Sequence, residues 1–349
     1  MELAGLPGHA CRVDRKLVAW RTAIARGSRG AARPAGWLSI VRRVDEALAQ
    51  PDIDPTGGEA VFVIAVFFLA LAILVGGAVL ARKNLREGRG DRTGALTLGS
   101  AVVAVLWGVW LCQVHVSASL SLIGNFLFAV CTTLFYGLLF WAVYLALEPF
   151  VRRYWPQTLV SWTTLLGGRV RDPIVGRDVL VGTALGVAIA LLIRGTARDP
   201  DFPPIKLLLG VRSTTGELLM HMVYATQTAL FVFFLLFLFG LLLRNQWLAA
   251  LVFVSLYAVL NSINSTQPIL EGVTTFVYFA MFAIAVLRWG LTTLAVGVLV
   301  ADLLLIAPAT TSLSAWYLGE MTLVLLIPLA LASWAFVTSI SQRSRIAGG

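Results

Sequence analysis

The sequence predicts an all-α fold: a polytopic helical membrane protein of about nine transmembrane helices. Two observations lead to this prediction. The chain is 58% hydrophobic and only 13% charged, whereas about a quarter of the residues in soluble domains are charged. The apolar runs are also continuous, as in residues 61–74, and this differs from the alternating pattern of a membrane β-barrel strand.

Nine apolar stretches provide the predicted spans, and a helix needs about 20 residues to cross the hydrocarbon of a bilayer. We expect them at residues 60–81, 96–114, 122–147, 179–193, 218–243, 247–260, 273–287, 291–306 and 318–340. The fourth, sixth, seventh and eighth are short, so they either borrow flanking residues or include re-entrant segments. The membrane domain is therefore predicted at 60–341, followed by a short C-terminal tail at 342–349.

Residues 1–59 differ in composition from the rest of the chain, since they hold nine basic and seven acidic residues. We expect an Arg-rich, largely flexible tail in which 37–49 forms one short amphipathic helix. No signal peptide is visible, because the stretch 17–25 is too short and too charged to be its apolar core.

The basic residues that follow the tail are distributed unequally between the two sides of the predicted bundle. One side carries 14 Lys and Arg residues and the other carries four. Basic loops stay in the cytoplasm, so we expect a multi-pass protein of the bacterial inner (plasma) membrane with a cytoplasmic C-terminus. This orientation would place the Arg-rich tail outside. Either one short span is miscounted, or the tail is not a natural N-terminus.

Several chemistries find no support in the sequence. It contains no HExxH, no Walker A loop and no GxSxG elbow. His9 and His115 have no acidic neighbour within a helical turn, His221 has only Glu217, and the three cysteines lack metal-ligand spacing. We therefore expect no enzyme activity, no cofactor and no metal. Nucleic acid is not an expected partner either, because aromatic and basic residues do not interleave on any soluble segment.

Ionisable residues close to a membrane are functional candidates, because charge is costly in lipid. Asp302 lies near the outer end of span eight, and Glu320 opens span nine on the same side. A proton or cation path is one interpretation; hydrated side chains at headgroup level are the other, which we favour because neither residue lies at mid-span. His221, with Gln227, either lines a cavity in span five or hydrogen-bonds to a neighbouring helix.

The loop between the third and fourth spans contains most of the other candidates, and its charges of opposite sign predict local ion pairs. We expect 159–166 to lie flat at the membrane surface with Trp162 among the headgroups, and the arginines to contact anionic lipids. A loop docked on the bilayer by its own arginines is favoured over a specific ligand site. The candidates are Glu148, Arg152, Arg153, Arg169, Arg171, Asp172, Arg177 and Asp178. In span four, Gly182 and Gly186 form a GxxxG for which helix packing is favoured over dimerisation.

Two loops also carry a family resemblance. The segments concerned are 147–153, 155–156, 169–173 and 175–180, together with 82–86 and 88–92. In these segments the chain resembles the membrane region that lies C-terminal to the kinase domain in large bacterial serine/threonine protein kinases, from about residue 52 to the C-terminus. The resemblance implies that the first span enters from outside. Kinase activity is not implied, because the glycine loop, β3 Lys, HRD and DFG motifs are missing. The chain looks like a severed or separately encoded membrane module.

The leading functional hypothesis is a non-catalytic membrane module that senses or anchors in kinase-linked signalling. Its expected partners are the lipid bilayer, anionic lipids, and a cytoplasmic kinase domain or a second copy of the chain. The alternative is a small-solute or ion transporter or channel, since short spans and the polar stretch 261–268 are typical of broken helices at a transport site. An intramembrane enzyme would need paired acidic or His groups facing each other at depth.

Overall fold

The computed structural model describes residues 57–88, 90–114, 121–197, 205–263, 267–307 and 318–346. The chain divides into two compact units, 1–56 and 57–349, and the second is described here by itself. The predicted amphipathic helix at 37–49 lies outside the described residues. So does the predicted tail, except that residues 57–59 begin the first helix.

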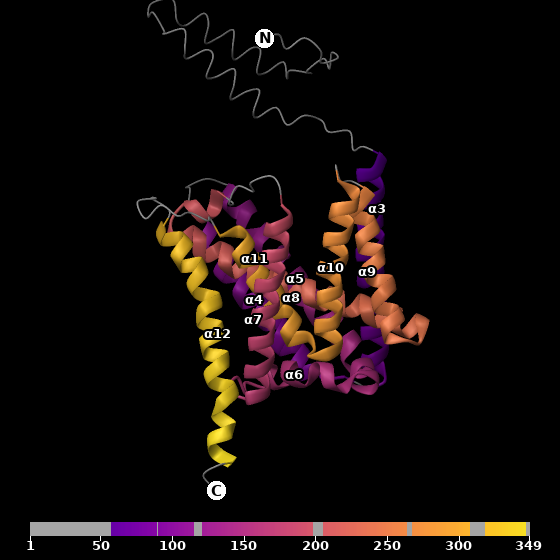
Figure 1. Ribbon diagram of the computed structural model, residues 1–349. Coiled ribbons are helices and arrows are strands. Elements are labelled where there is room, and N and C mark those ends of the chain that lie inside the picture. Colours follow the sequence, from indigo (N-terminus) through magenta and orange to yellow (C-terminus); the bar gives the residue numbers. More distant parts are fainter. Residues whose placement is uncertain are drawn as a thin grey trace, which may run out of the picture. The chain divides into compact units, whose positions relative to one another are not determined.

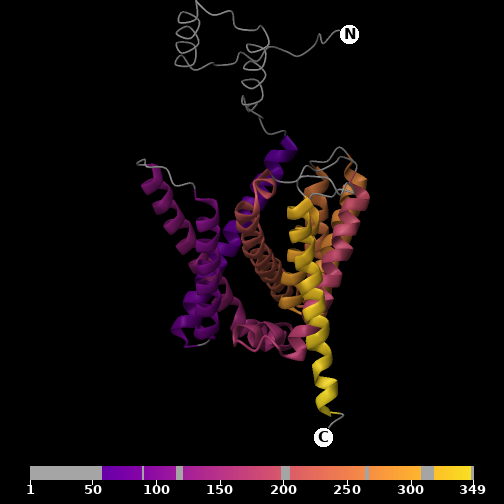
Figure 2. The same cartoon turned by 90° about the vertical axis from the view of Figure 1, so that its left-hand side faces the viewer.

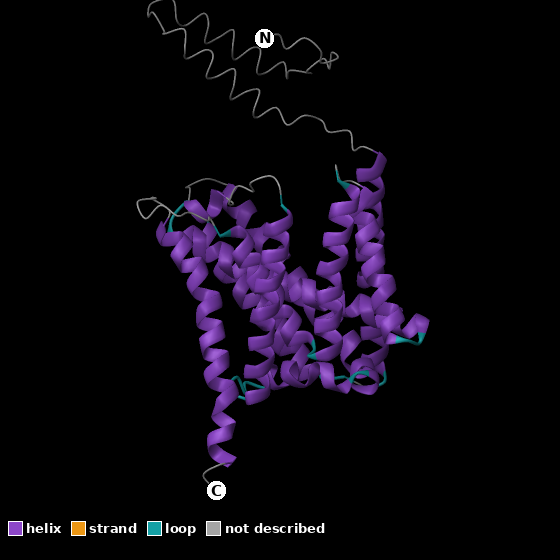
Figure 3. Ribbon diagram, in the orientation of Figure 1, coloured by secondary structure: helices purple, strands orange, loops and turns teal. Residues whose placement is uncertain are grey.

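The all-α prediction is confirmed for the described part of the chain, which contains helices and turns and no strand (Figure 3). Figure 1 labels the helices. The α-helices are α3 Gly57–Arg86, α4 Arg92–Gln113, α5 Ser121–Tyr154, α6 Val160–Leu166, α7 Pro173–Thr196, α8 Val211–Leu243, α9 Gln246–Ile263, α10 Pro268–Arg288, α11 Leu291–Ile306 and α12 Leu318–Ile346. Two short 3-10 helices, η1 Pro156–Leu159 and η2 Ile205–Leu208, precede α6 and α8.

Each predicted span coincides with one helix to within a residue or lies inside it. Seven helices of the described chain are long and apolar enough to cross a membrane: α4, α5, α7, α8, α9, α10 and α12. The predicted count of nine is not confirmed. Helix α11 is apolar but has 16 residues, about 24 Å of helix against a hydrocarbon thickness of about 30 Å. The other short spans did borrow flanking residues, as α7 does by beginning at Pro173.

The stretch 261–268, of which 264–266 lie outside the described residues, connects two helices that lie side by side (Figure 1). Asn261 belongs to the last turn of α9, and Pro268 opens α10, where the N–H that proline lacks would have no helical partner. The broken helix that motivated the transporter alternative is therefore absent from the described part of this region. At the C-terminus, α12 continues to Ile346 and so includes part of the predicted tail.

One end of the helix bundle collects the basic connections. The α3–α4 turn, α6 and the C-terminal end of α12 lie at this end (Figures 1 and 2). We call it the basic end. Its exposed basic side chains are Arg82, Lys83, Arg86, Arg92, Arg152, Arg153, Arg169, Arg171, Arg177, Arg244 and Arg288.

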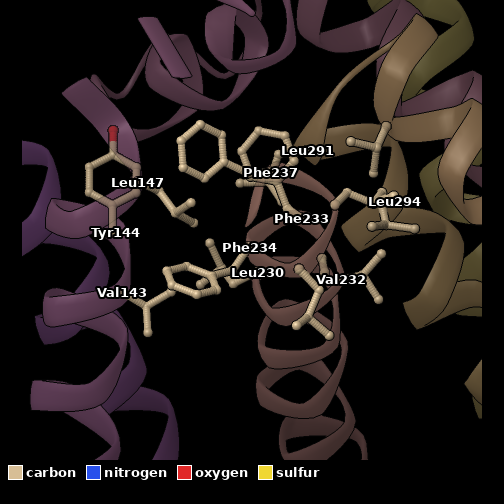
Figure 4. Close-up of a cluster of buried hydrophobic side chains, with 14 of the residues drawn as sticks. Val143, Tyr144, Leu147, Leu230, Val232, Phe233, Phe234, Phe237, Leu291 and Leu294 are labelled. Atoms are coloured by element: carbon tan, nitrogen blue, oxygen red, sulfur yellow. The ribbon is translucent and has the colours of Figure 1, made fainter. Parts of the chain in front are cut away.

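The core of the bundle lies around α8 and α11. Figure 4 shows Phe233, Phe234 and other side chains of α8 between Val143 of α5 and Leu294 of α11. No residue of α11 is exposed, which is typical of a helix that is apolar all round and surrounded by other helices. Lipid is as apolar as leucine, so close packing rather than the hydrophobic effect holds such helices together.

Small residues let α7 and α11 approach closely. A Cβ added at Gly182 would lie 2.7 Å from the carbonyl oxygen of Thr293, and one added at Gly186 would lie 2.6 Å from that of Gly297. Any side chain at either position would force the two helices apart. The GxxxG therefore packs against a helix of the same chain, as the sequence predicts.

The outward faces of the helices are apolar. Phe128, Leu242 and Val337 are 74%, 76% and 68% exposed, and they belong to different helices. Soluble monomers rarely expose apolar surface on this scale. A lipid environment accounts for it.

Candidate functional site

The first cluster of candidate residues is built on a buried carboxylate at the end of α5. Glu148 is 3% exposed, and its Oε2 accepts a hydrogen bond of 3.0 Å from the backbone N–H of Asp91. Arg152, one turn later, forms an ion pair with it. The local ion pairing that the sequence predicts is confirmed here, and the carboxylate also joins α5 to the α3–α4 turn.

Asn84 on α3 supplies a hydrogen bond that α5 cannot make for itself. Pro149 lies inside α5 and has no N–H, so the carbonyl of Leu145, four residues earlier, loses its helical donor. Asn84 Nδ2 donates to that carbonyl at 2.9 Å, and to the carbonyl of Ala146 at 3.3 Å. Sequence reasoning missed Asn84, because the third span was predicted to end at residue 147 and Pro149 therefore fell outside it; in the structure α5 continues past this proline and requires an outside donor.

The α3–α4 turn fits closely onto this part of α5. Gly90 has a φ of +106°, and a Cβ there would lie 2.9 Å from Leu145 Cδ1. Asp91 caps α4 by accepting the N–H of Gly94 at 2.8 Å, an arrangement that stabilises a helix start. The hydroxyl of the buried Tyr144 has no hydrogen-bond partner in the described chain. The two loops that carry the family resemblance are therefore in direct contact.

A second set of contacts attaches the segment 155–172 to the start of α11. Ser161 Oγ donates to Thr292 Oγ1 at 3.0 Å, and Thr293 Oγ1 donates to the carbonyl of Asp178 at 3.1 Å. Gly290 has a φ of +103° and lies against the backbone of Thr158, which leaves no space for a side chain. The first turn of α11 thus contacts both α6 and α7.

The predicted position of Trp162 among the headgroups is wrong. Trp162 is 5% exposed and belongs to the hydrophobic core. The reason is that α6 turns its Ser161, Trp162 and Thr164 inward, so that Ser161 reaches Thr292 on α11. Val160, at 44% exposure, lies on its outward face.

The arginines between the end of α5 and the start of α7 lie on the surface. Arg177 pairs with the buried Asp178 at 2.8 Å, and Arg153 lies over the ring of Tyr154 at 5.7 Å. Arg169 and Arg171 are exposed and form no ion pair with any described residue. Asp172 caps α7 by accepting the N–H of Ile174.

The structure brings together two candidates that are 81 residues apart in the sequence. His221 Nδ1 on α8 lies 3.8 Å from Asp302 Oδ2 on α11. This distance is too long for a hydrogen bond, and the two groups attract each other as charges when the imidazole is protonated. The side chain of His221 is 14% exposed and that of Asp302 is 34% exposed. Gln227, by contrast, has a buried Oε1 without a hydrogen-bond partner among the described residues.

Further charged groups lie near the same end of α8. Glu217, one turn before His221, is 3.8 Å from Lys206 Nζ and accepts a 3.5 Å hydrogen bond from Gln113 Nε2. Glu320 is in the first turn of α12, but its side chain lies outside the described residues, so its predicted role beside Asp302 stays a prediction. Within the described ranges, no three His, Cys, Asp or Glu side chains form a group able to hold a metal ion.

Fold and sites together define a class: a helical protein with several apolar helices of membrane-spanning length. Comparison with protein-family models, with curated proteins and with solved structures gives no match for this chain. The resemblance to the membrane region of bacterial kinases therefore stays a prediction.

Proposed function

We propose that this chain is a non-catalytic, multi-pass module of the bacterial plasma membrane, which senses a condition at one end of its bundle and transmits it to the basic end. The observation that carries the proposal is the position of α11. One end of this helix bears Asp302 beside His221. At the other end, Thr292 holds α6 of the segment 155–172 through Ser161, and Thr293 holds α7 through the carbonyl of Asp178.

A displacement of α11 would be transmitted because the helix is enclosed. Thr292 and Asp302 are ten residues apart, roughly 15 Å along the helix. At the glycine contacts, α7 and α11 pack so closely that no space remains between them. Packed interiors shift between discrete arrangements rather than deforming gradually. Protonation of His221, or a ligand that replaces it beside Asp302, changes the attraction at one end. The hydrogen bonds of Thr292 and Thr293 are at the other end.

The orientation we propose has the basic end and the C-terminus in the cytoplasm. Most exposed arginines of the described chain belong to that end, with Arg194 and Arg212 as exceptions, and positively charged loops remain on the cytoplasmic side. Arg169 and Arg171 form no ion pair within the described chain. They are therefore available to the anionic lipid surface and to an acidic face on a cytoplasmic partner. From the family resemblance, we propose a serine/threonine kinase domain as that partner.

Hydrogen exchange of the full chain in phospholipid nanodiscs tests the transmission. We expect Asp302→Asn and His221→Gln each to change the exchange of residues 155–172 at least threefold. The matched control is Glu271→Gln, an exposed carboxylate in the first turn of α10, which should leave that segment unchanged. Changes confined to the neighbourhood of His221 in both variants would refute the transmission.

A pull-down from the host tests the partner separately. The tagged chain is expected to recover a protein with a serine/threonine kinase domain, and the double variant Arg169→Glu with Arg171→Glu is expected to recover much less of it. Failure to recover any kinase domain would remove the kinase link, while the hydrogen-exchange result would still decide whether the module transmits.

A transporter remains the second candidate, and the half-buried His221–Asp302 pair favours it, because ionisable groups between membrane helices often form proton or ion pathways. Neither α9 nor α10 is interrupted along its length, and this is unfavourable to transport, since transport sites are commonly built at broken helices. Proton or cation flux into proteoliposomes that disappears with Asp302→Asn would establish transport in place of sensing.

A further inference from the structure

The basic end contains a cavity of about 760 Å³ between the end of α5 and the α8–α9 turn. Its lining includes Trp155, which directly follows α5, Phe237 and Leu241 from α8, Arg244 and Asn245 from the turn, and Trp247 from α9. Apart from Trp155, which begins the segment 155–172, none of these residues takes part in the contacts described above. The cavity lies where two apolar helices of membrane-spanning length end, which is the level at which lipid headgroups meet protein.

The walls of the cavity are apolar, and packing between aromatic rings fixes their position. The ring of Trp155 packs edge-on against Phe237, with 6.1 Å between ring centroids. A Cβ added at Gly240 would lie 3.1 Å from that indole ring, so a glycine here gives the cavity its depth. Leu241 is 53% exposed and Trp247 is 60% exposed. These two residues form the open side.

The open side is continuous with surface that faces lipid. Leu242 and Leu251, adjacent to the cavity on α8 and α9, are 76% and 53% exposed. An acyl chain is therefore able to reach Leu241 directly from the bilayer, while Phe237, which is 4% exposed, contributes to the lining. Aromatic residues such as Trp155 and Trp247 are typical of this level of a membrane protein, because their rings combine an apolar body with a polar N–H.

The polar side of the cavity selects a negative charge. Arg244 is the only charged residue among the described residues of its lining, and it forms no ion pair with any of the described residues. Its φ of +55° lies in the left-handed region, which is uncommon for an arginine. Asn245 Oδ1 accepts the N–H groups of Trp247 and Leu248 at 2.9 and 3.3 Å. These bonds leave its NH₂ group as a second donor at the cavity.

We propose that this cavity binds one anionic phospholipid. The phosphate-bearing headgroup lies against Arg244 and the amide of Asn245, and one acyl chain lies along Phe237, Leu241 and the ring of Trp155. The choice of an anionic lipid follows from the charge of the lining, one cation and no carboxylate. The choice of a lipid over a soluble anion follows from the apolar wall, which a free phosphate would leave uncovered.

Native mass spectrometry of the purified full chain tests the site with two probes, phosphatidylglycerol and phosphatidylcholine. One phosphatidylglycerol per chain should be retained in preference to phosphatidylcholine. Arg244→Asn should weaken its retention fivefold to tenfold, the effect of one cation and its charge-assisted hydrogen bonds on an anionic lipid. Asparagine tolerates the left-handed backbone, so this variant keeps the turn. Arg86→Asn, exposed in the last turn of α3 at the same end but outside the lining, is the control and should have little effect.

A second pair of variants tests the acyl-chain wall without changing charge. Leu241→Trp should fill the cavity and reduce retention of phosphatidylglycerol, while Leu242→Trp, next to it but outside the lining, should not. Equal losses in Arg244→Asn and Arg86→Asn, or equal retention of the two lipids, would overturn the site. Displacement of the lipid by millimolar glycerophosphate, or an unchanged Leu241→Trp variant, would overturn the lipid as its ligand.

Discussion

The hydrogen bond between Asn84 and the carbonyl of Leu145 exists because Pro149 removes the donor that α5 would otherwise provide. Replacing Asn84 with alanine leaves this carbonyl, in a buried position, without a partner. Asn84 is 2% exposed, so water cannot easily take its place. A buried acceptor left unsatisfied costs about 1 to 3 kcal/mol, and the small cavity left by the side chain adds to this cost. We therefore expect Asn84→Ala to lower the free energy of unfolding by about 2 to 3 kcal/mol.

The proline provides the matched background. In the variant Pro149→Ala the backbone N–H at 149 returns and can donate to Leu145, so Asn84 is no longer required. Asn84→Ala should then cost about 1 kcal/mol or less, which gives a coupling energy of about 1 to 2 kcal/mol in a double-mutant cycle. Reversible unfolding in mixed detergent micelles, followed by circular dichroism, provides the four free energies.

A surface variant controls for general effects of mutation. Thr97 is exposed on α4 and donates only to the carbonyl of Thr93 in its own helix. Thr97→Ala should therefore change the free energy of unfolding by less than about 0.5 kcal/mol in either background. Equal losses for Asn84→Ala with and without Pro149 would refute the reasoning, because the asparagine would then stabilise the bundle for a reason unrelated to the missing N–H.

Three further predictions follow from the packing and the charges. Gly186→Ala should destabilise the chain by about 2 kcal/mol or more, because its Cβ would lie 2.6 Å from a backbone oxygen. Gly195→Ala, in the same helix with nothing within 4 Å of its Cβ, should be neutral or stabilising. Thermal unfolding in detergent compares the two variants. Equal losses of stability in both would contradict the close contact between α7 and α11. Ser161→Ala should speed hydrogen exchange in α6 by removing the donor to Thr292, while Ser100→Ala on α4 should not. The orientation is tested in a variant with Cys11, Cys112 and Cys131 replaced by serine. There, Arg171→Cys should react with an impermeant maleimide only after the cells are opened, whereas Leu209→Cys, exposed near the start of α8, should react in intact cells. The reverse pattern would contradict the proposed orientation.

The candidate sites show how far sequence reasoning reaches. The ion pairs Glu148–Arg152 and Arg177–Asp178 join residues within one helical turn, so their spacing alone predicts them. The contact between His221 and Asp302 does not follow from spacing, because α8 and α11 meet only in the folded bundle. The burial of Trp162 was missed for a related reason. Its amphipathic surroundings suit a membrane surface, but Thr292 on α11 provides a hydrogen-bond partner for the neighbouring Ser161, and α6 turns inward.

The sequence by itself determined the all-helical class and the approximate position of each apolar helix. A helix satisfies its backbone hydrogen bonds within its own segment, so a continuous apolar run in lipid has few other conformations available to it. Only the tertiary structure decided which residues meet across the bundle: Asn84 with the carbonyl that Pro149 leaves free, the glycines of α7 with α11, and Arg244 with its cavity. These contacts join residues far apart in the chain, and they depend on how whole helix surfaces fit together, which no local pattern of residues specifies.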